Sequence, residues 1–85
     1  MLSKQLVLKN RGGLHARPAT LFVQLANRYQ SKITVVLDER ETNAKSIIGL
    51  MTLGAGQGKE ITVIVDGVDE QVAMEEITAF LQKAD

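Results

Sequence analysis

The sequence has 85 residues, of which 45% are hydrophobic and 24% are charged, a balance typical of one folded domain over residues 1–85 and not of a disordered chain. Ten basic and ten acidic residues cancel, so we expect neither nucleic-acid binding nor attraction to anionic membranes. Cysteine is absent and the N-terminus has no apolar run long enough for a signal peptide or a membrane span, so we expect a cytoplasmic protein without membrane insertion.

The first half of the chain is predicted to form a strand, a helix and a hairpin. Leucines at even spacing predict a strand over residues 2–9. Helical spacing predicts a helix over residues 16–27, and residues 32–38 alternate as a strand does. The acidic cluster that follows predicts a turn into a third strand ending near Asn43. The helix is expected to bury a broad apolar face: Ala19, Leu21, Phe22, Val23, Leu25 and Ala26.

The second half is predicted to form a short helix, a strand and a longer helix. Ser46 is a good N-cap for a helix over residues 46–53. Residues 60–66 alternate as a strand, and Asp69 is the expected N-cap of a helix over residues 69–83. The order β-α-β-β-α-β-α predicts an α+β open-faced β-sandwich, with a four-stranded antiparallel sheet covered on one face by three helices.

The sequence GGLHARPAT, which begins at Gly12, contains the only histidine and the only proline of the chain. If His15 caps the first helix, Pro18 falls in the first turn, where its missing N–H is not needed. The free N–H groups and positive dipole end of a helix start attract anions and disfavour imidazolium, so His15 is expected to be neutral and able to attack phosphorus. Arg17 offers a fork of donors that suits phosphoryl oxygens.

These residues carry a family resemblance that covers essentially the whole chain. The motif GLHARPA, the apolar helix after it and the motif NAKSIIGLMTLG are similar to the histidine-containing phosphocarrier (HPr) family of the bacterial phosphoenolpyruvate-dependent sugar phosphotransferase system. The resemblance implies a carrier, not an enzyme, in which His15 Nδ1 is phosphorylated by phospho-enzyme I and passes the group to IIA domains of sugar permeases. It also implies that Arg17 and the Ala16 and Arg17 amides stabilise the phosphoryl group. Gly12 departs from the family, because many relatives have a polar side chain there.

Two roles are expected for Ser46, one structural and one functional. As an N-cap it stabilises the second helix whatever else it does. The resemblance further implies that an ATP-dependent HPr kinase/phosphorylase phosphorylates it. The apolar residues of so short a helix cannot all point inward, so we expect an exposed patch that, with basic residues, docks acidic partners. The expected partner-binding residues are Arg17, Thr20, Arg28, Lys45, Ile47, Ile48, Leu50 and Met51.

A regulatory binding module is the main alternative. The segments LFVQLANRY, NAKSIIGLM and GVDEQ resemble the paralogue called catabolite repression HPr, which implies a corepressor role of phospho-Ser46 with a catabolite-control transcription factor. That paralogue typically lacks the acceptor histidine. Because this chain has His15, the phosphocarrier reading is favoured.

Other chemistries have weaker support in the sequence. An acid–base enzyme built on His15 and Arg17 would lack a second titratable partner nearby in sequence. Residues 54–59, GAGQGK, precede a strand and are not followed by Ser or Thr, which disfavours a nucleotide-binding loop. Asp38, Glu39 and Glu41 read as a solvated turn, so we expect no metal and no cofactor.

Overall fold

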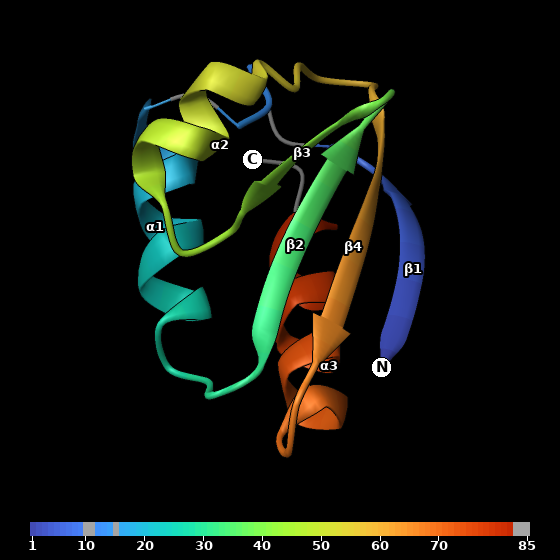
Figure 1. Cartoon of the computed structure of the whole chain (residues 1–85). Helices are drawn as coiled ribbons and strands as arrows, with labels where there is room; N and C mark the ends of the chain where they lie inside the picture. The colour runs from blue at the N-terminus through green and yellow to red at the C-terminus, as the bar shows by residue number, and fades with distance from the viewer. Residues whose placement is uncertain (10–11, 15, 83–85) are drawn as a thin grey trace.

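The computed structural model describes residues 1–9, 12–14 and 16–82 (Figure 1). Helices and strands follow the predicted order: β1 (Leu2–Val7), α1 (Ala16–Ala26), β2 (Lys32–Leu37), β3 (Arg40–Asn43), α2 (Ile47–Leu53), β4 (Glu60–Asp66) and α3 (Glu70–Leu81). The predicted fold class is thereby confirmed, and the predicted boundaries hold to within two residues.

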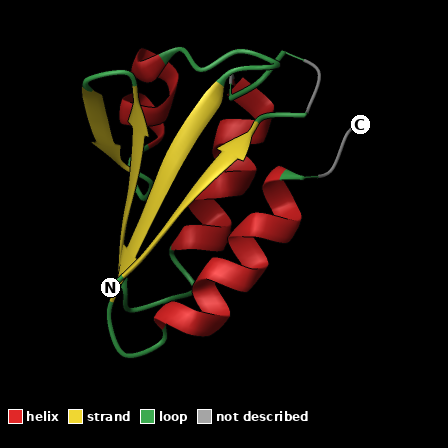
Figure 2. Ribbon diagram, turned by 90° about the vertical axis from the view of Figure 1, so that its right-hand side faces the viewer, coloured by secondary structure: helices red, strands yellow, loops and turns green. Residues whose placement is uncertain are grey.

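The four strands form one antiparallel sheet in the order β1-β4-β2-β3. Val63 of β4 is paired with Lys4 of β1 on one side and with Val35 of β2 on the other. Figure 2 shows α1 and α3 against one face of the sheet, and α2 contacts β3 and α1. The alternation of apolar and polar residues in β2 and β4 matches this arrangement, because one face is buried and the other is open.

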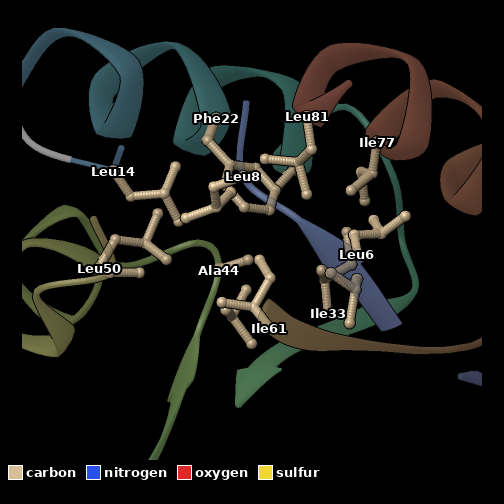
Figure 3. Close-up of a cluster of buried hydrophobic side chains, with 14 of the residues drawn as sticks. Leu6, Leu8, Leu14, Phe22, Ile33, Ala44, Leu50, Ile61, Ile77 and Leu81 are labelled. Atoms are coloured by element: carbon tan, nitrogen blue, oxygen red, sulfur yellow. The ribbon is translucent and has the colours of Figure 1, made fainter. Parts of the chain in front are cut away.

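The core lies between the sheet and the helices (Figure 3). Helix α1 buries Ala19, Phe22 and Ala26 completely. Leu21, predicted for the same face, is 45% exposed, and Leu25 is only partly buried. At about 100° per residue, Ala19 and Ala26 lie on one side of Phe22 around the helix, whereas Leu21 lies on the other side, beyond the edge of the buried face. The buried face of α1 is therefore narrower than predicted.

The start of α3 confirms Asp69 as the N-cap residue, and the structure shows where its side chain is bound. Asp69 occupies the N-cap position, but its side chain makes no hydrogen bond to its own helix. The carboxylate instead accepts the N–H groups of Gln30 at 2.8 Å and Ser31 at 3.0 Å, together with the Ser31 hydroxyl. Because Ser31 is fully buried, its polar groups need a partner within the protein, and Asp69 provides it. Lys83, expected in the last turn of this helix, lies outside the described residues.

Candidate functional site

Helix α1 begins at Ala16, directly after the histidine that the sequence singles out. Pro18 lies in its first turn, where the N–H groups of Ala16 and Arg17 have no acceptor within the helix. Arg17 is exposed there, and the hydroxyl of the exposed Thr20 donates to the Ala16 carbonyl at 2.8 Å. The predicted acceptor His15 lies outside the described residues.

The chain enters α1 through a tightly packed turn. Gly12 and Gly13 have φ angles of 78° and 67°, a left-handed backbone that favours glycine at both positions. A Cβ on Gly13 would overlap the Ala55 carbonyl oxygen and lie 2.6 Å from the Gly56 backbone. The buried Leu14 donates its N–H to the Ala55 carbonyl at 2.8 Å. The start of α1 is therefore fixed against the loop that follows α2.

Ser46 caps α2, as predicted. Its backbone is extended, with φ −112° and ψ 112°, and its Oγ accepts the Gly49 N–H at 3.0 Å. The preceding turn is held by the Asn43 side chain, which accepts the Lys45 N–H at 2.9 Å, and by the Asn43 carbonyl, which accepts the Ser46 N–H at 3.0 Å. The helix ends at Gly54, whose φ of 70° is that of a left-handed cap.

The exposed apolar residues of α2 are Ile47, Ile48 and Met51, which we call the α2 patch. Their exposed fractions are 36%, 75% and 48%. Leu50, which was expected to bind partners, is completely buried and belongs to the core. Leu50 and Leu53 are three residues apart and so share one face of the helix, which is the face that packs inward.

The expected basic residues do not gather in one place. Arg28 follows the end of α1, and an eleven-residue helix is about 16 Å long, so Arg28 is far from Arg17. The ammonium group of Lys45 donates to the Tyr29 carbonyl at 2.7 Å, just beyond the end of α1. Of the three predicted cations, Arg17 is thus the one at the start of α1.

Two hydrogen bonds fix how α2 lies along α1. The bond between Leu14 and Ala55 joins the loop after α2 to the start of α1, and the bond between Lys45 and Tyr29 joins the turn before α2 to the end of α1. Helix α2 lies next to α1 (Figure 1). Because it has seven residues, its two ends, Ser46 and Leu53, are about 10 Å apart.

One charged contact at the site was missed by the sequence analysis. The Arg40 guanidinium donates to the Leu53 carbonyl at 2.9 Å and so satisfies one of the last carbonyls of α2. Arg40 belongs to β3, and no local pattern places it at the end of a helix thirteen residues later. Only the packing of α2 against β3 brings the two together.

The described residues contain neither a metal-binding cluster nor a membrane-spanning helix. Within residues 1–9, 12–14 and 16–82, no group of three or more His, Cys, Asp or Glu side chains is placed to hold a metal ion. None of the helices in that part of the chain has the length and apolar character needed to cross a bilayer.

Comparisons with known proteins agree with these motifs. A family model described as the PTS HPr component phosphorylation site matches residues 2–83. The HPr-like protein Crh of Halalkalibacterium halodurans is 53% identical over 83 residues, covering 98% of this chain and 99% of the relative. The phosphocarrier protein HPr of Treponema pallidum is 46% identical, covering 96% of this chain and 93% of the relative.

Solved structures show the same relationship. The crystal structure of HPr from Thermoanaerobacter tengcongensis superposes with a TM-score of 0.93 at 41% identity, covering 96% of this chain and 92% of the other. The crystal structure of Bacillus subtilis Crh has a TM-score of 0.80 at 44% identity, covering all of this chain and 98% of the other. With a family model that matches nearly every residue and relatives that align end to end, this chain belongs to the HPr family of phosphocarriers of the phosphotransferase system.

Proposed function

We propose that His15 takes a phosphoryl group from phospho-enzyme I and passes it to IIA domains of sugar permeases in the cytoplasm. The Nδ1 lone pair attacks phosphorus, a P–N bond forms, and the bond from phosphorus to the donor breaks. The observation that carries this proposal is that α1 begins at the residue after His15 and directs the N–H groups of Ala16 and Arg17 toward its N-terminal end. Those amides and the exposed Arg17 guanidinium would stabilise the phosphoryl oxygens.

The carrier would meet its partners through Arg17, Thr20 and the α2 patch. The patch offers apolar surface at the end of the molecule that holds the start of α1 (Figure 1). A small apolar contact beside one cation suits a shuttle, which must release each partner after transfer. The carrier itself has no turnover, because the phosphohistidine is consumed by the next protein in the relay.

Ser46 is proposed as a regulatory phosphorylation site for HPr kinase/phosphorylase. Its Oγ faces the start of α2, so a phosphate would sit at the positive end of a helix, which favours negative charge. The domain would tolerate the modification, and the new charge would lie beside Ile47 at the edge of the α2 patch.

A second function, that of a regulatory module acting through phospho-Ser46 and a catabolite-control transcription factor, is favoured by one observation. The relative that is 53% identical carries the name HPr-like protein Crh. The histidine at position 15 supports the relay as the principal role, and both roles are compatible in one chain.

The test of the relay is incubation with enzyme I and phosphoenolpyruvate, followed by mass analysis. We expect one acid-labile phosphoryl group in the wild type and none in His15→Ala, with unchanged thermal melting of the variant. Phosphate incorporation that persists in His15→Ala would exclude the proposed acceptor.

Arginine variants separate a local role from a general charge effect. Arg17→Ala is expected to slow transfer without abolishing it, because the helix-end amides remain. Arg28→Ala is the matched control, since it removes the same charge at the other end of α1. Equal rates for the two variants would contradict the role of Arg17.

Kinase treatment tests Ser46 separately. HPr kinase and ATP should place an acid-stable phosphate on the wild type and not on Ser46→Ala. A wild type that stays unmodified would leave Ser46 with its capping role only.

A further inference from the structure

The sulfur atoms of this chain differ sharply in their surroundings. The sequence has three methionines and no cysteine, so every sulfur is a thioether. Met74 is buried, with 7% exposure, whereas Met51 is 48% exposed and Met1 is 76% exposed. Oxidation of methionine requires access of the oxidant to the side chain, so we expect the exposed Met51 and Met1 to react before the buried Met74.

Met51 is the only one of the three methionines in the α2 patch. Ile47 and Ile48 precede it by four and three residues, so the three side chains adjoin on one side of α2. Met1 lies near the opposite end of the molecule (Figure 1), where its ammonium group pairs with Glu70 at 2.9 Å. The chain therefore contains an exposed methionine inside the patch and another far from it.

We propose that Met51 is a reversible oxidation site through which peroxide weakens partner docking at the α2 patch, an inference that rests on the proposed function. The Met51 sulfur attacks one oxygen of hydrogen peroxide, an S–O bond forms and the O–O bond breaks. The other oxygen leaves as water after proton transfer, so sulfur loses two electrons and peroxide gains two. A thiol-dependent methionine sulfoxide reductase restores the thioether.

The sulfoxide would act on docking and not on folding. Oxidation changes a flexible apolar side chain into a polar one, and a polar group buried at an interface without a hydrogen-bond partner opposes binding. The inward face of α2 is built from Leu50 and Leu53, which oxidation leaves unchanged. Oxidised protein should therefore melt at the wild-type temperature and still bind enzyme I more weakly.

The first measurement needs no partner protein. The folded chain is treated with hydrogen peroxide, and sulfoxide at each methionine is followed by peptide mapping. Met51 and Met1 are expected to oxidise about tenfold faster than Met74, in rough proportion to their exposed fractions of 48% and 76% against 7%. Equal rates for Met51 and Met74 would overturn the proposal.

The second measurement compares phosphoryl transfer before and after peroxide treatment. Oxidised wild type should show a raised KM for phospho-enzyme I, and treatment with the reductase should restore it. Met51→Leu is the matched control: it keeps an apolar side chain of similar size, and its Met1 is still oxidised. Peroxide should leave its KM unchanged.

The outcomes distinguish the oxidation proposal from the proposed phosphocarrier function on which it rests. An untreated wild type that takes no phosphoryl group contradicts the proposed function, and the docking effect falls with it. Normal transfer before treatment and an unchanged KM after it overturns the oxidation proposal alone. An equal rise of KM in Met51→Leu also overturns it, because the effect would then come from another methionine.

Discussion

At the scale of single residues, the Ser46 hydroxyl can be tested as a cap apart from any modification. Ser46→Ala removes the acceptor of the Gly49 N–H, and loss of a cap lowers the free energy of unfolding by about 1 kcal/mol. Ser46→Asp keeps an acceptor at the same place and should unfold close to the wild type. Urea unfolding of the three proteins measures the difference. An Ala variant as stable as the wild type would show that the cap contributes nothing.

A second residue, Asp69, links stability to pH. Its pKa is lowered from the ordinary value of 3.8, first by the hydrogen bond from the Ser31 hydroxyl and then by the one from the Gln30 N–H. A carboxyl group whose pKa is lower in the folded state stabilises the fold above its unfolded pKa, and this contribution is lost as pH falls through the folded value. Asp69→Asn should therefore be less stable than the wild type at neutral pH, and the gap should narrow below pH 3.8.

Unfolding free energies measured from neutral to acidic pH check this. Glu70 also has a lowered pKa, through its hydrogen bond with the N-terminal ammonium group. The wild type and Asp69→Asn therefore both lose stability in acid. The difference between them isolates Asp69. Ser31→Ala, which removes the largest cause of the shift, should also reduce the acid dependence. A gap between wild type and Asp69→Asn that stays constant with pH would contradict the linkage.

At the scale of elements, the junction of α2 and β3 explains a glycine within a helix. Alanine is preferred over glycine by about 1 kcal/mol in a helix interior, yet a Cβ on Gly49 would overlap the Thr42 Oγ1 and lie 3.2 Å from the Ser46 Oγ. Gly49→Ala is therefore expected to destabilise the protein by about 1–3 kcal/mol, the usual effect of overpacking.

The clash can be separated from other effects with a double-mutant cycle. Thr42→Ala removes the oxygen that the new methyl group would meet, so Gly49→Ala should be less harmful in that background. Denaturant unfolding of the two single variants and the double variant gives the coupling energy. The same loss in both backgrounds would show that Thr42 is not the obstacle.

The elements were predictable from the sequence to the extent that their causes are local. The alternation in residues 60–66 and the serine before Ile47 act on their own neighbourhood, and both predictions are confirmed. Leu50 was misassigned because hydrophobicity does not say which side of a short helix faces the core. The roles of Asp69 and Arg40 depend on contacts with segments far away in sequence, so no local pattern could reveal them.

The candidate site divides in the same way. Its motifs were recognisable because the start of a helix and the residues beside it adjoin in sequence. The separation of the basic residues could not be predicted from the sequence. The length of α1 places Arg28 far from Arg17, and the contact with Tyr29 holds Lys45 near the same end of α1.

At the scale of the whole molecule, the position of Ser46 at one end of α2 predicts how phosphorylation acts on the docking surface. The length of α2, about 10 Å, is close to the Debye length of ~8 Å at physiological ionic strength. In Ser46→Asp, transfer from enzyme I should be slower than in the wild type. Part of this loss should change with added salt, whereas loss of apolar contact at the α2 patch should not.

Transfer rates across a salt series, measured beside thermal melts, give the two contributions. Ser46→Asn is a control of similar size without the charge, and its rate should not share the salt dependence. A large fall in melting temperature for Ser46→Asp would assign the effect to the fold. Equal transfer by Ser46→Asp and wild type at every salt concentration would exclude α2 from the docking surface.

The strand order has a consequence for how the protein is made. β1 precedes the other strands in sequence, yet within the described residues the strand that it pairs with is β4, and β4 also joins β1 to β2. A nascent chain that ends before Glu60 lacks the strand with which β1 pairs. The sheet can therefore close only after β4 has been synthesised, through a pairing between segments more than fifty residues apart in sequence.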